Sequence, residues 1–410
     1  MATASSVGLS GCGDDEADGA TAGTGMFDTA TDTSVADTTV STSTSSTDTS
    51  SGDTNSDVGD TTDTAEDTVV EDTRVAALAA AVKSNDGVFV IPAGIADRSA
   101  VTVSGDLVMW VERDDAESGA RLALWAPLSP DLAPVTYRVP NLKNPSQLAF
   151  DGDFAVYVDD RYGDDDIFAL DLTTGIERVV VTRPGAQSHP AIKGSLVAWE
   201  DCRGCVSGSD DTGYDIVSRN LDGGLETIVT NDDTADRSPV FGTLADGSPA
   251  LAWVSGLSTL RTISVNDAGV TDVSWDMAGP VGGVALAEGV LAWRASPFII
   301  NPDSMRPTDV FFTDVSNGDT IPITLHAELA LSLPVPPMAG GNLVAWLTSR
   351  QSAPNRTDVA VYRAGNASEV AVESVDSQVS SFALSQTTLA LTAPRTDNDD
   401  MPDVWIWLLP

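Results

Sequence analysis

A short run of aliphatic residues ending in an aromatic residue recurs along most of this chain. It is clearest as SLVAW at 195–199, and related runs follow at intervals of 40 to 54 residues. Aligned on the final residue, these runs give seven anchor positions: Trp110, Tyr157, Trp199, Trp253, Trp293, Trp346 and Leu391. A unit of this length forms one small sheet that cannot bury its faces alone, so several copies must pack side by side.

Each anchor run is followed by further segments with the composition of β-strands. After Tyr157 these segments are DDIFALDL (165–172), ERVVVT (177–182) and HPAIKG (189–194). They are short, rich in β-branched or aromatic residues, and bounded by glycine, proline, asparagine or aspartate. Helical spacing of apolar residues is nearly absent. Four short strands per unit indicate the blades of a β-propeller, in which the aromatic anchors fill the space between neighbouring sheets.

We therefore predict an all-β fold over residues 85–410: a seven-bladed β-propeller of four-stranded antiparallel blades. The seventh unit ends after its second strand, and GVFVIPAG (87–94) and SAVTVSG (99–105) would supply its third and fourth strands. The N- and C-terminal strands would then share one blade and leave no open sheet edge. The unit at 246–280 is degenerate, so six and eight blades are the alternatives. The six aromatic anchors are interpreted as packing residues between blades.

The first 73 residues have a different composition from the repeats. They contain 16 acidic residues, no lysine or arginine, and mostly threonine, serine and aspartate. Residues 13–73 cannot bury enough apolar surface to offset the entropy of ordering, so we predict a disordered linker. LSGC, ending at Cys12, resembles a bacterial lipobox, which makes residues 1–12 the remnant of a lipoprotein signal and Cys12 the lipidation site. MATASSVG lacks the basic and apolar parts of a signal peptide. Either the natural start lies upstream or Cys12 is an ordinary residue.

The charge of the chain restricts its partners. Lysine and arginine number 21 against 61 aspartates and glutamates, which gives a net charge of −40. Such a surface repels nucleic acid and anionic lipid headgroups. No stretch of 18 apolar residues occurs, so we expect membrane contact through a lipid anchor alone.

The second and third units carry a more specific pattern than the others. It runs Gly152-Asp153, Val156-Tyr157-Val158, Asp160-Arg161 and Asp166-Ile167-Phe168, and Trp199, Asp201, Arg203 and Asp215 occupy matching places one unit later. This pattern resembles the TolB-like propeller repeats of secreted and periplasmic proteins. The resemblance implies a propeller used mainly for protein interaction, without a shared active site. It also implies structural pairing, across adjacent loops, for the acids and arginines that follow the anchors: Asp160, Arg161, Asp166, Asp201, Arg203 and Asp215.

Two further groups of residues could carry chemistry. The loops after the anchor strands are long and acidic, and Asp397, Asp399 and Asp403 in DNDDMPD offer hard oxygen ligands suited to calcium. Solvated acidic loops without a bound ion are the alternative. Cys202 and Cys205 form a single CxxC, which in an oxidising compartment would close a small disulfide. Free thiols, or a metal or redox role, are the alternatives, although half a zinc site has no second pair of cysteines here.

These observations favour a protein that is not an enzyme. We expect an extracytoplasmic, outer-membrane lipoprotein facing the periplasm or the cell surface, whose acidic loop face binds an envelope protein or polysaccharide. It would be a monomer without a cofactor, with calcium as the one candidate ion. The alternative is a carbohydrate-active enzyme, a glycoside hydrolase or polysaccharide lyase, that uses loop carboxylates.

Overall fold

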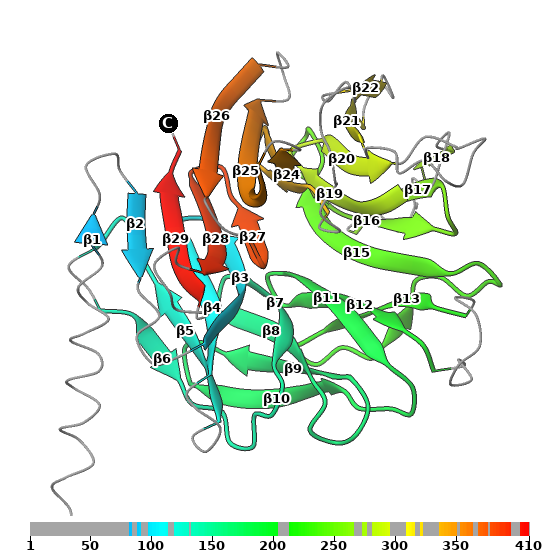
Figure 1. Cartoon of the computed structure of the whole chain (residues 1–410). Coiled ribbons are helices and arrows are strands. Elements are labelled where there is room, and N and C mark those ends of the chain that lie inside the picture. The colour runs from blue at the N-terminus through cyan, green and yellow to red at the C-terminus, as the bar shows by residue number, and fades with distance from the viewer. Residues whose placement is uncertain are drawn as a thin grey trace, which may run out of the picture. The chain divides into compact units, whose positions relative to one another are not determined.

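The computed structural model forms a ring of β-sheets (Figure 1). It describes residues 82–83, 88–91, 97–113, 119–130, 133–203, 213–265, 273–276, 281–295, 309–315, 320–322, 336–350, 353–363, 368–375, 378–394 and 402–409. All of them lie in one of the chain's two compact units, Thr62–Pro410. Within these ranges no helix is long and apolar enough to cross a membrane.

Seven antiparallel sheets make up the ring, and we number them as blades 1 to 7. Blade 1 holds β3 (Asp97–Ser104), β4 (Leu107–Arg113), β5 (Ala120–Trp125) and β6 (Val135–Tyr137); blade 2 holds β7 (Ser146–Asp151), β8 (Phe154–Asp159), β9 (Asp166–Asp171) and β10 (Ile176–Val181); blade 3 holds β11 (Gln187–Lys193), β12 (Leu196–Asp201), β13 (Asp215–Asn220) and β14 (Thr227–Ile228).

The remaining blades follow the same order along the chain. Blade 4 holds β15 (Asp236–Thr243), β16 (Pro249–Ser255), β17 (Thr259–Ser264) and β18 (Val273–Asp276); blade 5 holds β19 (Val281–Ala287), β20 (Val290–Ala295), β21 (Asp309–Asp314) and β22 (Thr320–Pro322); blade 6 holds β23 (Met338–Gly340), β24 (Leu343–Arg350), β25 (Ala353–Arg363) and β26 (Ser368–Val375); blade 7 holds β27 (Ser381–Leu384), β28 (Thr388–Pro394), β29 (Pro402–Leu408), β2 (Val88–Ile91) and β1 (Val82–Lys83).

The first strand of each blade faces the centre of the ring. Each of these inner strands contacts the inner strand of the next blade, and β27 of blade 7 contacts β3 of blade 1, which closes the circle (Figure 1). The seven-bladed prediction is therefore confirmed. The closed ring also places the ends of all seven inner strands around one axis.

Both ends of the chain contribute to blade 7, as predicted. The N-terminal β2 pairs antiparallel with the C-terminal β29, with Val88 opposite Trp407 and Ile91 opposite Val404. The assignment of 99–105 to this blade was wrong, because β3 is the inner strand of blade 1. The error arises because the anchors lie on the second strand of a blade. A unit counted from its anchor therefore ends with the inner strand of the next blade.

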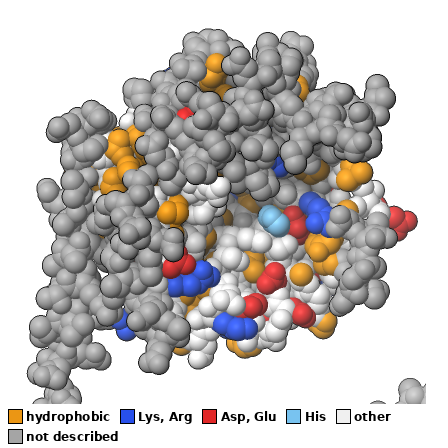
Figure 2. Space-filling view, viewed as in Figure 1, with side chains coloured by type: hydrophobic (Ala, Val, Ile, Leu, Met, Phe, Trp, Pro, Cys, Tyr) orange, Lys and Arg blue, Asp and Glu red, His pale blue; other side chains and the backbone are white. Residues whose placement is uncertain are grey.

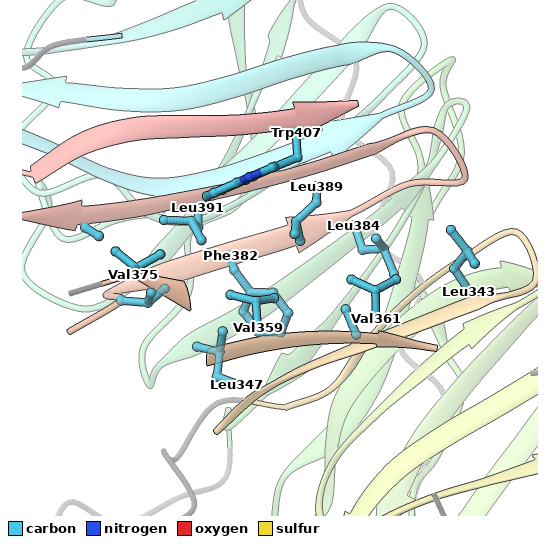
Figure 3. Packing of buried hydrophobic residues seen from close by; sticks show 13 residues of the cluster. Leu343, Leu347, Val359, Val361, Val375, Phe382, Leu384, Leu389, Leu391 and Trp407 are labelled. Carbon is cyan, nitrogen blue, oxygen red and sulfur yellow. The ribbon is translucent and has the colours of Figure 1, made fainter. Parts of the chain in front are cut away.

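Hydrophobic clusters occupy every interface between neighbouring blades. Each contains one anchor, packed against the blade that precedes it: Trp110, Tyr157, Trp199, Trp253, Trp293, Trp346 and Leu391. Between blades 6 and 7 the smaller anchor Leu391 is supplemented by Trp407 from β29, which lies beside Leu389 and Leu391 (Figure 3). Burial of large apolar side chains in these layers is what holds adjacent sheets together.

Most inner strands share a local irregularity. In β3, β7, β11, β15 and β19 the pairing with the second strand shifts by a bulge near the start of the strand. Within four of these bulges one residue adopts a left-handed backbone conformation: Ala100, Gln147, His189 and Ser238, with φ between 47° and 54°. Bulges re-aim side chains next to them, and here they do so around the axis.

Candidate functional site

At three places among the described residues, the start of an inner strand meets the loop between the second and third strands of the preceding blade. We call this end of the propeller the loop face. Backbone N–H groups of Gln187, Asp236 and Val281 donate to the carbonyls of Asp165, Tyr214 and Leu257, each over 2.8 Å. Backbone hydrogen bonds therefore tie the acidic loops of blades 2 and 3, and the equivalent loop of blade 4, to the inner strand of the following blade.

Carboxylates crowd one another on the loop face of blade 2. Burial raises the pKa of Asp166 to about 6, and the charge of Asp164 adds to this effect. The pKa of Asp165 is raised by burial and then by Asp160 and Asp164. Like charges at short range disfavour ionisation, so these shifts indicate a local excess of negative charge.

A second acidic group lies where blades 3 and 4 meet. The pKa of Asp215 is raised by burial and by the charges of Asp236 and Asp232. Burial likewise raises the pKa of Asp236, whose carboxylate accepts a hydrogen bond from the indole of Trp253 over 3.0 Å. The acidic loop face thus extends across at least three blades.

The acids and arginines that follow the anchors form structural pairs. The Arg161 guanidinium lies 2.8 Å from Asp159, 2.9 Å from Glu177 and 3.9 Å from the centre of the Phe168 ring. Arg203 lies 2.6 Å from Asp201 in the next blade. These pairs lie within one blade, whereas Asp160 pairs with Lys143 in the adjacent connection. The spacing anchor–x–acid, seen in Trp110–Glu112, would have identified Asp159.

The third strands share a feature that our reading of single motifs missed. Five of the seven contain an aspartate followed by valine or isoleucine: Asp166, Asp215 and Asp309 are the first residues of their strands, Asp403 is the second residue of β29, and Asp358 lies within β25. Asp166 accepts a backbone hydrogen bond from Arg183, which lies in the connection that leads to the next inner strand. The recurring aspartate therefore holds the link between blades at this position.

The predicted calcium ligands and modified cysteines lie mostly outside the described residues. Asp403 is buried in β29, close enough to Arg98 to raise the pKa of that guanidinium against the larger effect of burial. Asp397 and Asp399 are not described, so the calcium site stays a prediction. Cys202 is disulfide-bonded. Its expected partner Cys205, and the lipidation candidate Cys12, also lie outside the described residues.

The structure brings together a histidine and a glutamate that sequence analysis did not connect. Nδ1 of His189 lies 3.2 Å from Oε2 of Glu200 and 3.3 Å from the hydroxyl of Ser188. The Glu200 side chain is 2% exposed and that of His189 is 52% exposed. Figure 2 shows a histidine side chain exposed beside acidic and basic side chains on the viewed face. A buried carboxylate thus orients a partly solvated imidazole.

This pair also connects three blades. Glu200 accepts a 2.5 Å hydrogen bond from the backbone N–H of Ser238 in blade 4, and the backbone N–H of His189 donates to Gln147 in blade 2. Burial alone would lower the pKa of His189, but the hydrogen bond and charge of Glu200 outweigh burial and raise it. The sequence contains one signal for Glu200. The residue that follows the anchor is valine in three other units (Val111, Val158, Val254), so a glutamate at this position stands out.

The architecture defines this chain as a β-propeller, and known structures agree. No protein-family model and no curated protein matches the chain. It is similar to an oligogalacturonate lyase from Vibrio parahaemolyticus, with 11% identity, 80% of this chain and 96% of that chain covered, and a TM-score of 0.54. It is also similar to the propeller domain of the Trilobed protease from Pyrococcus furiosus, with 7% identity, coverage of 76% and 93%, and a TM-score of 0.53.

TolB proteins are among the similar structures as well. TolB from Acinetobacter baumannii is 18% identical over 65% of this chain, with a TM-score of 0.43, and the chain spans 64% of its length. At these identities, the similarities to the oligogalacturonate lyase and to the protease propeller show a shared fold.

Proposed function

We propose that this chain is an extracytoplasmic, lipid-anchored β-propeller that acts as a non-enzymatic binding scaffold through its loop face. Cys12 carries the anchor in an outer-membrane lipoprotein, and the partner is an envelope protein or polysaccharide that presents cationic groups. Calcium ions could serve as the bridge to a polysaccharide, because carboxylate oxygens are the ligands that calcium prefers.

The crowding of carboxylates on the loop face supports this proposal. Asp165 and Asp215 both have a raised pKa in part because neighbouring aspartates repel their ionised forms. A cationic partner would relieve that repulsion, so ionisation and binding favour each other. Loops held on a rigid scaffold are also where binding residues concentrate in many folds.

A carbohydrate-active enzyme, either a glycoside hydrolase or a polysaccharide lyase, is the second candidate function. Two observations favour it: the pKa of Asp166 is raised to about 6, in the range of catalytic acids, and His189 presents an imidazole oriented by Glu200. The similarity to an oligogalacturonate lyase, which is a likeness of fold, keeps acidic polysaccharides among the substrates to test.

The binding proposal can be tested by capture of solubilised envelope components on the immobilised full chain. We expect capture to weaken with rising salt and to fall in the double variant D164N/D165N. The matched control D222N/D246N removes two exposed carboxylates that lie in turns away from the loop face, so capture should persist. Equal capture by both double variants would contradict the loop face as the binding surface.

The enzymatic alternative is tested on a panel of acidic and neutral polysaccharides, with release of reducing or unsaturated ends as the readout. We expect no turnover. Cleavage that disappears in Asp166→Asn or His189→Asn would reverse the ranking of the two functions.

The lipid anchor is tested by metabolic labelling with a palmitate analogue in a bacterial host, using a gene that includes its upstream codons. We expect label in the native chain and none in Cys12→Ser. Equal labelling of both would exclude Cys12 as the attachment point.

A further inference from the structure

The end of the propeller opposite the loop face contains a cavity on the axis. We call this end the turn face, because it is formed by the seven turns that join each inner strand to the second strand of its blade. The cavity has a volume of about 320 Å³ and is lined by the last residues of all seven inner strands. This volume falls at the lower end of the range of small-molecule sites, roughly 300–1,000 Å³.

The wall of the cavity below its rim combines apolar side chains with polar atoms, and the polar atoms expose more surface to the cavity. Six inner strands contribute one apolar residue each at equivalent positions: Val103, Phe150, Ile192, Phe241, Leu286 and Leu384. Blade 6 instead contributes Ala339 followed by two glycines, which leaves space on that side. Phe150, Ile192, Leu286 and Leu384 are also buried in the clusters between blades, so a ligand would meet the edges of these side chains and bury a compact apolar body there.

The rim of the cavity is acidic. Its cation, Lys193, lies 3.3 Å from Asp151, and Asp151 also accepts hydrogen bonds from Ser104 and from the backbone of Gly194. Glu288 is exposed at the rim, and its carboxylate makes no ion pair with any residue that the structure describes. The charge left over at the rim is thus negative.

The surrounding turns carry the same sign. All seven turns of the turn face are described, and together with the last residue of each inner strand they contain five carboxylates against the single amine of Lys193. The carboxylates belong to Asp106, Asp151, Asp153, Asp246 and Glu288. Their combined field concentrates cations at the mouth of the cavity.

Glu288 occupies a position that disfavours a side chain. It is the first residue of its turn, where blades 1, 2, 3 and 6 all have a glycine with φ between 56° and 60°, and its own φ is 47°. The left-handed region costs a non-glycine residue of this kind conformational free energy. Strain of this type concentrates at functional positions, which points to a role for the carboxylate.

We propose that the axial cavity binds a small cationic amphiphile, an amine or quaternary ammonium ion carried on a compact apolar body. Glu288 pairs with the cation at the rim, and the apolar ring receives the body. This site lies at the opposite end of the inner strands from the loop face, so it is separate from the proposed binding surface for the envelope partner.

Three probes with one indole body and different charges test the proposal by isothermal titration calorimetry on the full chain at 150 mM salt. Tryptamine is cationic, tryptophol neutral and indole-3-propionate anionic. We expect tryptamine to bind about tenfold more tightly than tryptophol, and indole-3-propionate not to bind. Equal heats for tryptamine and indole-3-propionate, or no binding of tryptamine up to 10 mM, would overturn the proposal.

Variants locate the binding. Glu288→Gln should weaken tryptamine about tenfold and leave tryptophol unchanged, whereas Ala339→Phe should fill the cavity and abolish both. Asp222→Asn removes an exposed charge outside the cavity, so tryptamine should bind this variant as tightly as the native chain. A loss of affinity equal to that in Glu288→Gln would mean that only the net charge of the protein matters, and it would overturn the site.

Two further measurements separate this site from other effects. A melting temperature of Ala339→Phe within a few degrees of the native value shows that the variant is folded. Should it misfold, the Glu288→Gln comparison still decides the question. Capture of the envelope partner by the loop face should be the same in both variants. The binding proposal for the loop face and the proposal for the axial cavity can therefore fail independently.

Discussion

At the turn of blade 5, the left-handed backbone of Glu288 has a consequence for stability that binding measurements do not report. Glycine adopts this conformation without steric cost. We expect Glu288→Gly to raise the free energy of unfolding by about 1 kcal/mol while it removes the rim charge. The reverse change at the equivalent turn, Gly194→Glu, should lower it by a similar amount, since a Cβ there meets no other atom and only backbone strain is added. Chemical denaturation of the two variants measures both signs, and an unchanged midpoint in both would contradict backbone strain.

A second prediction at this scale concerns the His189–Glu200 pair. The pKa of His189 is raised in the folded state, so the pair stabilises the fold fully below pH 6.5, the ordinary pKa of histidine, and this contribution is lost as the pH rises through the folded pKa. The charged groups that face His189 are Glu200 on β12 and Arg237 on β15, and Glu200 outweighs Arg237. The effect should be below about 1 kcal/mol because solvent screens a half-exposed imidazole.

Urea unfolding at pH 5.5 and pH 8.5 measures this contribution. The native chain should lose more stability over this interval than His189→Asn does. Glu200→Gln should reduce the change in stability over the same pH interval. Lys193→Gln, which alters a residue on the same strand as His189 but away from Glu200, should leave that change as it is in the native chain. A pH dependence that survives in His189→Asn would assign the titration to another group.

At the scale of a single element, the aspartate that begins a third strand sets the pH response of its loop. The pKa of Asp166 is raised to about 6, so the folded state binds a proton more tightly than the unfolded chain does. Stability therefore increases as the pH falls from about 7 towards 4, opposite to a salt-bridged acid. Asp166→Asn should raise stability at pH 7.5 by about 1 kcal/mol and have little effect at pH 4.5.

Thermal unfolding of the native chain and Asp166→Asn at both pH values measures this difference. The control is Asp246→Asn: hydrogen bonds from Ser248 lower the pKa of Asp246, so its removal should not stabilise the fold at pH 7.5. A destabilised Asp166→Asn at pH 7.5 would mean that the hydrogen bond from Arg183 outweighs the cost of the charge.

The strands themselves were largely predictable, and the reason lies in their side chains. β12 and β13 are short, apolar and bounded by turn residues, so their local pattern reports their structure. The boundary between blades was not local information. Whether β11 belongs to the sheet before it or to the sheet after it depends on which strand it pairs with. The residues of β11 do not show by themselves that Lys193 pairs with Leu196 in the same hairpin.

The candidate sites show the same limit. The acidic loops were visible in the sequence because carboxylates and turn residues are recognised one at a time. The contact between His189 and Glu200 depends on a bulge and a left-handed residue, and the axial cavity depends on seven strand ends that are about 280 residues apart at the extremes, from Val103 to Leu384. Sites formed by residues that meet only when the ring closes cannot be predicted without knowing the arrangement of the blades.

For the molecule as a whole, closure of the ring depends on β2. Its residues Phe89 and Ile91 are buried between blades 7 and 1, and Arg98 of blade 1 donates to the carbonyl of Ile91 over 2.5 Å. A chain that begins at residue 87 loses β1 and should unfold close to the native midpoint. A chain that begins at residue 95 also loses β2, and we expect it to lose at least ~3 kcal/mol, because large buried side chains go with it.

Differential scanning calorimetry of the two truncated chains checks this prediction, with the native chain as reference. Equal midpoints for the chains beginning at 87 and at 95 would show that the ring stays closed without β2. A chain beginning at 95 that also exposes the edge of β29 should associate with itself, because an unpaired strand edge invites pairing with another chain.

The antiparallel pairing of β2 with β29 also determines how the protein would respond to mechanical load. Everything N-terminal to Val88 is attached to the propeller through this strand. A pull on the leading segment, as a moving membrane or a bound partner would exert, reaches the ring at blade 7 before any other sheet. The β1–β2 pairs, Val82–Val90 and Lys83–Phe89, bear tension first, and the register from Val88–Trp407 to Ile91–Val404 bears it next. The strand that completes blade 7, β2, is therefore also where a mechanical pull would first open the ring.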